Sequence, residues 1–134
     1  MLSIPGDDVE GVYGIKTLAD ADALSPRMSA ASNVVVVGCG FIGLEFAAVA
    51  AALGKSVQLV DRGDRLMARA ISHEMSALFL NAHQSWGVKF HFNQGVSRIT
   101  HANGKVTGVV KENGEELPAD LVVYGIGIIP NITL

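Results

Sequence analysis

The strand-like stretches of the chain differ in how their apolar residues are spaced. Val34 to Val37 are four β-branched residues in a row, which is typical of a strand buried on both faces of a parallel sheet. Ser56 to Val60 and Leu121 to Tyr124 are also largely apolar, whereas Val88 to Phe92 alternates apolar with polar residues. The pattern predicts three buried strands and one half-buried strand near a sheet edge.

Two further stretches carry apolar residues at helical spacing. The first predicted helix ends at Gly54, a natural left-handed cap, and its apolar stripe is Ile42, Phe46, Val49 and Leu53. The second begins at Ser72, has Glu74 in its first turn and ends at Gly87. Its apolar face is Met75, Phe79, Ala82 and Trp86. We expect the first stripe to face a sheet and the residues of the second to share one face of their helix.

Residues 1–32 are predicted to be a leading linker with a short helix, ahead of a core formed by residues 33–134. Pro5-Gly6, two more glycines and three acids mark residues 1–16 as an extended segment. Thr17 can cap a short helix that runs to Leu24. Ser25-Pro26 has the form of an N-cap followed by proline at the first helical position.

Short strands dominate the region after residue 95. They are predicted over Val96–His101, Lys105–Lys111 and Glu115–Pro118, and Asn-Gly pairs at 103–104 and 113–114 separate them. Asn-Gly is the strongest short-range signal for a hairpin turn. We therefore expect an antiparallel β-meander where a doubly wound fold would have a crossover helix. The fold class is α/β in three layers: a parallel sheet, helices and the small meander.

The first buried strand leads directly into a loop with the spacing Gly-x-Gly-x-x-Gly. Gly38 is expected to make a tight turn, Gly40 to let the backbone approach a pyrophosphate, and Gly43 to let helix pack closely on strand. A helix that starts near Phe41 points free N–H groups at that pyrophosphate. Strand, loop, helix and second strand fit within roughly 30 residues, the size of a βαβ unit. The loop predicts a dinucleotide site.

Asp61 follows the second strand, 18 residues after Gly43. A carboxylate there can accept hydrogen bonds from both hydroxyls of an adenosine ribose, which favours NAD over NADP. The adjacent Arg62, with Arg65 and Arg69 close behind, could attract a 2′-phosphate instead. Alternatively, these arginines lie in a solvated loop and do not contact the dinucleotide.

Other reactive side chains give weaker signals. Glu45, in the first turn of the glycine-loop helix, either complements the helix dipole or has a specific task. Cys39 has no partner cysteine and is interpreted as structural. The histidines at positions 73, 83, 91 and 101 lack the spacing of a metal site or a triad and are predicted to be surface residues. We predict no catalytic residue and no metal ligand.

Composition limits which classes of protein the chain can belong to. The 134 residues are 49% hydrophobic and 17% charged, which indicates one folded domain with a core. A net charge of −3 provides no basic field for nucleic acid, and the longest apolar run, Phe46 to Leu53, is too short to cross a bilayer. One cysteine excludes an internal disulfide. We expect a cytoplasmic protein without a nucleic-acid or membrane partner.

Four segments occur in an order that resembles a known family. They are residues 17–24, Gly38 to Glu45, Leu117 to Val123, and Pro130-Asn131. With the meander and the run Gly125 to Asn131, the chain resembles the NAD-binding domain of FAD-dependent pyridine nucleotide-disulphide oxidoreductases. Within that family it looks closest to the ferredoxin reductases of cytochrome P450 and ring-hydroxylating oxygenase systems. The resemblance implies a Rossmann-like FAD/NAD(P)-binding fold over nearly all 134 residues.

The resemblance also implies roles for individual residues. Those that match the pyrophosphate loop are Gly38, Gly40, Phe41, Ile42 and Gly43. Those that match the adenosine end are Asp61 at the ribose, Arg62 and Arg69 beside it, and Val96 in the adenine pocket. Those that match the nicotinamide end are Glu45, Gly125, Ile126 and Gly127.

The family implies a larger parent enzyme. It would pass electrons from NADH through FAD to an iron–sulfur partner of ferredoxin type. Members carry an FAD domain with its own glycine-rich loop before this region and a second flavin segment after it, and neither is present here. We therefore expect residues 1–134 to be a single NAD(H)-binding domain fragment that binds dinucleotide but is inactive alone. The alternatives are the NAD domain of a disulfide, peroxide or nitrite reductase, or a stand-alone nucleotide-binding module.

Overall fold

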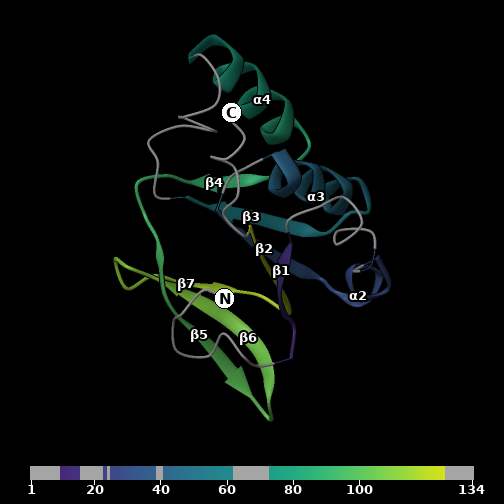
Figure 1. Cartoon of the computed structure of the whole chain (residues 1–134), viewed down its shortest axis with the longest axis vertical. Helices are drawn as coiled ribbons and strands as arrows, with labels where there is room; N and C mark the ends of the chain where they lie inside the picture. Colours follow the sequence, from purple (N-terminus) through teal and green to yellow (C-terminus); the bar gives the residue numbers. More distant parts are fainter. Residues whose placement is uncertain (1–9, 16–22, 24, 39–40, 62–72, 126–134) are drawn as a thin grey trace.

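The computed structural model describes residues 10–15, 23, 25–38, 41–61 and 73–125 (Figure 1). These residues form a five-stranded parallel sheet with the order β1-β8-β2-β3-β4 and a three-stranded antiparallel sheet with the order β5-β6-β7. The parallel strands are β1 Val12–Ile15, β8 Leu121–Gly125, β2 Asn33–Val37, β3 Ser56–Val60 and β4 Lys89–His91. The antiparallel strands are β5 Val96–Ala102, β6 Lys105–Lys111 and β7 Glu116–Pro118. The predicted α/β class and the predicted meander are confirmed.

Three layers follow from the alternation of side chains along the central strands. In β2, Val34 and Val36 pack in one hydrophobic cluster with residues of helix α3, Phe41–Ala52. Val35, between them, belongs to a second cluster that contains Ile99 and Val109 of the meander. Figure 1 shows helices on one side of the large sheet and the meander on the other. Because successive strand residues point to opposite faces, one run of valines contributes to both cores.

The two meander turns are built as their Asn-Gly pairs predict. Asn103 and Gly104 both have positive φ, 54° and 78°, and they join Ala102 to its paired residue Lys105. Positive φ at both positions is the geometry of a type I′ hairpin. At the second turn Gly114 has φ 94°, and the Asn113 side chain accepts the N–H of Glu115 at 2.9 Å.

The segment expected to be a linker contributes a strand to the large sheet. Residues Val12–Ile15 form the edge strand β1, paired parallel with β8. Val12 packs against the cluster under the meander, and the Val122 N–H donates to the Gly11 carbonyl oxygen at 2.7 Å. The linker interpretation is therefore wrong for these residues, because pairing with a distant strand leaves no local signal. Thr17 lies outside the described residues, and Pro26 lies in the first turn of α2, Ser25–Ala30.

Both predicted helix stripes need correction. On α3, Val49 and Leu53 are 44% and 54% exposed, and the buried face consists of Gly43, Leu44, Phe46, Ala47 and Ala50. Small residues on this face let the helix approach the sheet closely. Of the predicted stripe, Phe46 is buried, and the side chain of Ile42 lies outside the described residues. On α4, His73–Ser85, Met75 is exposed, as is Trp86 just beyond the helix. Leu80 and His83 are less exposed on that helix.

Candidate functional site

The strand order creates a crevice at one edge of the large sheet. From β2 the chain moves outward to β3 and β4, and then returns through the meander to β8 on the other side of β2. Val37 is paired with Val60 of β3 and with Tyr124 of β8. The strands are parallel, so Gly38 after β2, Asp61 after β3 and Gly125 at the end of β8 lie at the same carboxyl edge. Ligands of open α/β sheets bind at such a switch point.

Gly38 makes the predicted tight turn. Its φ is 83°, a backbone conformation that favours glycine, and its N–H donates to the Val60 carbonyl oxygen at 2.9 Å. The turn after β2 is therefore anchored to β3.

Gly43 makes the predicted close contact between helix and strand. A Cβ at this position would lie 3.2 Å from the Gly38 carbonyl oxygen and 3.3 Å from Val36 Cγ1. The start of α3 lies so close to the Gly38 turn that a side chain at residue 43 would force its neighbours to shift by a few tenths of an ångström. The strand, turn and helix start are thus packed closely together, and we call this arrangement the cradle; anions in other proteins bind at a helix N-terminus of this kind. Gly40, the middle glycine, lies outside the described residues.

Glu45 is the fifth residue of α3 and is exposed. The first turn of α3 contains no acidic residue, so Glu45 is not the dipole-complementing acid of that turn. It lies one turn along the helix from the cradle. The remaining interpretation, a specific task at the ligand, stays a prediction.

Asp61 is half-buried at the end of β3, and its main chain is held on both sides. Its N–H donates to the His91 carbonyl oxygen at 3.0 Å, and its carbonyl oxygen accepts the Gln94 N–H at 3.1 Å. The residue after β3 is thereby fixed against β4 and the loop that follows β4. The main chain from which the Asp61 carboxylate extends therefore has a defined position beside β4.

The remaining predicted site residues are only partly described. Val96 is buried in the cluster between the sheet and the meander. For Phe41, Ile42 and Gly125 the structure gives the backbone alone. Those outside the described residues are Gly40, Arg62, Arg69, Ile126 and Gly127.

Two histidines contradict the expectation of surface positions. His83 is 5% exposed, and its Nε2 lies 3.0 Å from the Leu44 carbonyl oxygen of α3. Its ring also packs against Trp86 and against Phe90. His91 is half-buried and contacts Gln58 and the buried Lys111. The alternation around residue 90 placed His91 on the polar face of its strand, but the meander covers that face.

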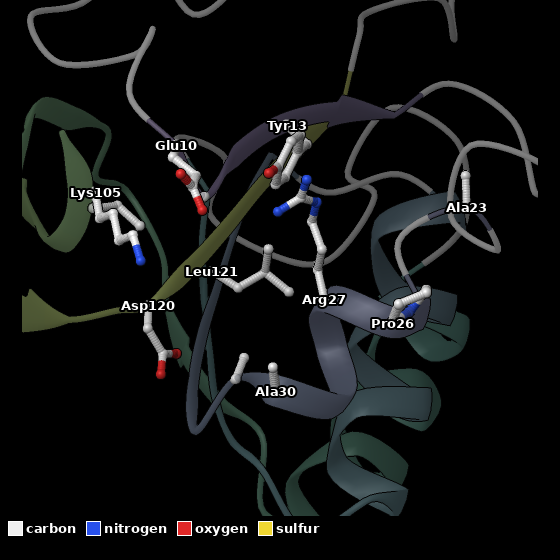
Figure 2. Close-up of a pocket in the computed structure, with 12 residues that line it drawn as sticks. Glu10, Tyr13, Ala23, Pro26, Arg27, Ala30, Lys105, Asp120 and Leu121 are labelled. Carbon is white, nitrogen blue, oxygen red and sulfur yellow. The ribbon is translucent and has the colours of Figure 1, made fainter.

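A hollow of about 630 Å³ lies at the opposite, amino edge of the large sheet. Figure 2 shows Glu10, Lys105 and Arg27 around it. The Arg27 guanidinium lies 5.0 Å from the centre of the Tyr13 ring. Asp120 lines it too, but its carboxylate already accepts the N–H groups of residues 32 and 33. The hollow contains none of the predicted site residues. The candidate site remains the carboxyl edge.

The residues that the structure describes contain neither a metal-binding group nor a membrane-spanning helix. Among those residues, no three His, Cys, Asp or Glu side chains are grouped so that they could hold a metal ion. None of the helices placed there has the length and apolar character needed to cross a membrane.

The fold agrees with comparisons to known proteins. The whole chain, residues 1–134, matches the pyridine nucleotide-disulphide oxidoreductase family. Rhodocoxin reductase from Rhodococcus erythropolis is 43% identical over 134 residues, which are 100% of this chain and 31% of that protein.

Two solved structures extend the comparison. A ferredoxin reductase from Rhodopseudomonas palustris matches with a TM-score of 0.91 and 42% identity, over 98% of this chain and 33% of that one. The covalent putidaredoxin reductase–putidaredoxin complex gives a TM-score of 0.83 and 35% identity, over 93% of this chain and 30% of the matched chain. This chain therefore belongs to the pyridine nucleotide-disulphide oxidoreductase family. It spans about a third of the length of these relatives.

Proposed function

We propose that the chain binds NAD(H) across the carboxyl edge of its five-stranded sheet. The observation that carries this proposal is the meeting of Gly38, Asp61 and Gly125 at the switch point, beside the start of α3. The close contact at Gly43 supports it, because a pyrophosphate needs bare backbone at a helix N-terminus.

Three groups of residues would divide the dinucleotide among them. The pyrophosphate group is Gly38, Gly40, Phe41, Ile42 and Gly43. The adenosine group is Asp61, Arg62, Arg69 and Val96. The nicotinamide group is Glu45, Gly125, Ile126 and Gly127. The order of strands supports this division, because β3 and β8 lie on opposite sides of β2. The adenosine end would then lie over β3 and the nicotinamide end over β8.

NADH is the preferred form in this proposal. The Asp61 carboxylate follows β3 and can accept hydrogen bonds from both ribose hydroxyls, whereas a 2′-phosphate would face a like charge. The arginines at 62 and 69 would then contact the adenosine half rather than select for NADPH.

We further propose that the whole protein is an NADH-dependent FAD oxidoreductase of the ferredoxin reductase kind, located in the cytoplasm. The names of the similar proteins support this, since they are reductases of rhodocoxin, ferredoxin and putidaredoxin. FAD, bound by another part of the longer protein, would accept hydride from NADH and pass electrons on to an iron–sulfur protein. The residues of this chain would hold the nicotinamide in place for that transfer.

The test is titration of the chain with NADH and with NADPH, for wild type and for Asp61→Ala. A hydrogen bond to a charged group contributes roughly 1.5–3 kcal/mol, so the Kd for NADH should rise by about tenfold to a hundredfold. The Kd for NADPH should change less, because the variant also removes a repulsion. The control is Glu116→Ala, an exposed acid on β7. Equal affinity of the wild type for both nucleotides would contradict the assignment of Asp61 to the adenosine ribose.

A further inference from the structure

His91 lies where three strands from the two sheets meet. Its Nε2 is 2.8 Å from Oε1 of Gln58 on β3, and its Nδ1 is 3.0 Å from Nζ of Lys111 on β6. Lys111 is 2% exposed, and its ammonium also pairs with Oε1 of Glu115 at 2.7 Å. The imidazole therefore bridges the parallel sheet and the meander.

The partners of the ring fix its protonation state. The side-chain amide oxygen of Gln58, Oε1, can only accept a hydrogen bond, so the His91 Nε2–H donates to it. The Lys111 ammonium can only donate, so Nδ1 must accept and carries no proton. A second proton on the ring would remove this acceptor and would place two cations about 3 Å apart. The bridge exists only with neutral His91.

The same strand holds the main chain of Asp61. The His91 carbonyl oxygen accepts the Asp61 N–H, and Gln94 donates its own N–H to the Asp61 carbonyl oxygen. The next residue, Gly95, exchanges two hydrogen bonds with Glu112 at the end of β6, at 2.9 Å and 3.1 Å. The position of Asp61 thus depends on how β6 sits against β4 and its following loop.

We propose that neutral His91 is a positioning residue for the adenosine end of NAD(H), because it locks β6 against β3 and β4 and so holds Asp61 in place. This rests on the proposed function, in which Asp61 receives the ribose. Protonation of the ring breaks its hydrogen bond with Lys111. The main chain of Asp61 is then held less firmly, and dinucleotide binding weakens.

The surroundings of the ring keep it neutral above mildly acidic pH. Burial, the largest cause, and the Lys111 charge lower the pKa of His91 below its ordinary value of 6.5. Lys89, on β4 itself, acts in the same direction, and Glu115 opposes them. Gln58 on β3 is uncharged. We therefore expect the ring to gain its second proton at lower pH than an unperturbed histidine does.

The test is calorimetric titration of the 134-residue chain with ADP-ribose between pH 5 and pH 8. ADP-ribose contains the adenosine end and the pyrophosphate but no nicotinamide. Wild-type affinity should be constant at neutral pH and fall about threefold to tenfold in acid, as expected for one lost hydrogen bond. His91→Asn keeps an uncharged acceptor near the Nδ1 position and cannot titrate, so its affinity should not fall. His101→Asn, at an exposed position on β5, should behave as wild type.

A second variant tests the charge directly. Gln58→Glu places a carboxylate beside Nε2–H, which raises the pKa of His91 and should move the midpoint of the affinity loss to higher pH. The ring titration of His91, followed by NMR, should shift by the same amount.

The outcomes separate this proposal from the one on which it rests. An acid loss of affinity that is the same in wild type and His91→Asn overturns the positioning role while leaving NAD(H) binding intact. A midpoint that does not move in Gln58→Glu has the same meaning. If neither ADP-ribose nor NADH binds the wild type at any pH, the proposed function fails, and the positioning role fails with it.

Discussion

A methyl group on Gly43 would press against the Gly38 carbonyl oxygen, at 3.2 Å, inside the turn proposed to hold the pyrophosphate. Alanine gains roughly 1 kcal/mol of helix propensity over glycine, against roughly 1–3 kcal/mol for overpacking. We expect Gly43→Ala to lower the free energy of unfolding by less than about 2 kcal/mol. NADH binding should weaken by about tenfold or more, because the loop N–H groups move. Urea unfolding and calorimetry measure the two effects.

Val49→Ala is the matched control for that variant. Val49 lies on the same helix but is exposed on its outer face, so this change should leave NADH affinity unaltered. Wild-type affinity in Gly43→Ala would contradict the cradle at the helix start.

Some features of single residues could be predicted from the sequence, and others could not. The tasks of Gly38 and Gly43 were predictable, because the turn and the close contact arise within one strand, loop and helix. The burial of His83 and His91 was not, since it depends on elements distant in sequence. His83 contacts α3 through the Leu44 carbonyl oxygen, and His91 is covered by the meander.

At the scale of elements, Asp120 ties the start of β8 to the start of β2. Its carboxylate accepts the N–H groups of Ser32 and Asn33, each at 2.9 Å, and its own N–H donates to the Asn33 carbonyl oxygen. We expect Asp120→Ala to lower the free energy of unfolding by about 1–2 kcal/mol, since the bonds are charge-assisted but exposed. Asp120→Asn keeps one acceptor oxygen and should lose less.

Urea unfolding of the two Asp120 variants measures this difference, and NADH titration supplies the second readout. Asp120 is at the amino edge, opposite the candidate site, so both variants should bind NADH within about twofold of wild type. A loss of affinity as large as that of Asp61→Ala would show that the two edges are not independent.

The elements differ in how well their sequences predict them. Buried strands and the first hairpin follow from local chemistry, namely β-branched runs and the positive φ at Asn103 and Gly104. The inner face of α3 does not, because Ala47 and Ala50 face the core while the larger Val49 faces solvent. Edge strand β1 was not predicted, because only its pairing with β8 makes it a strand.

For the whole molecule, the meander does more than replace a crossover helix. It covers the face of the large sheet that the helices leave open, through Ile99, Val106 and Val109 packed on Val35 and Val122. It also brings Lys111 to His91, next to the end of β3. The assignment of Gly125 to the nicotinamide end came from resemblance to a family rather than from local pattern. The structure adds the order of strands, in which β8 lies next to β2 and Gly125 ends its strand beside the Gly38 turn.

The stability of the molecule should fall on acidification in two steps. A His91 pKa below 6.5 means that the unfolded chain takes up a proton first, so this stability is present above about pH 6.5 and is lost as the pH falls. The hydrogen bond and charge of Lys111 likewise lower the pKa of Glu115 below 4.5, so its contribution is lost at lower pH still.

Urea midpoints measured from pH 8 to pH 3.5 test this expectation. Wild type should decline first below about pH 6.5 and again below about pH 4.5. His91→Asn should lack the first decline, and Glu115→Gln should lack the Glu115 contribution to the second. His101→Asn should retain both, because its ring lies outside the cluster. A first decline that persists in His91→Asn would place the titrating group elsewhere and remove the physical basis for coupling between the meander and Asp61.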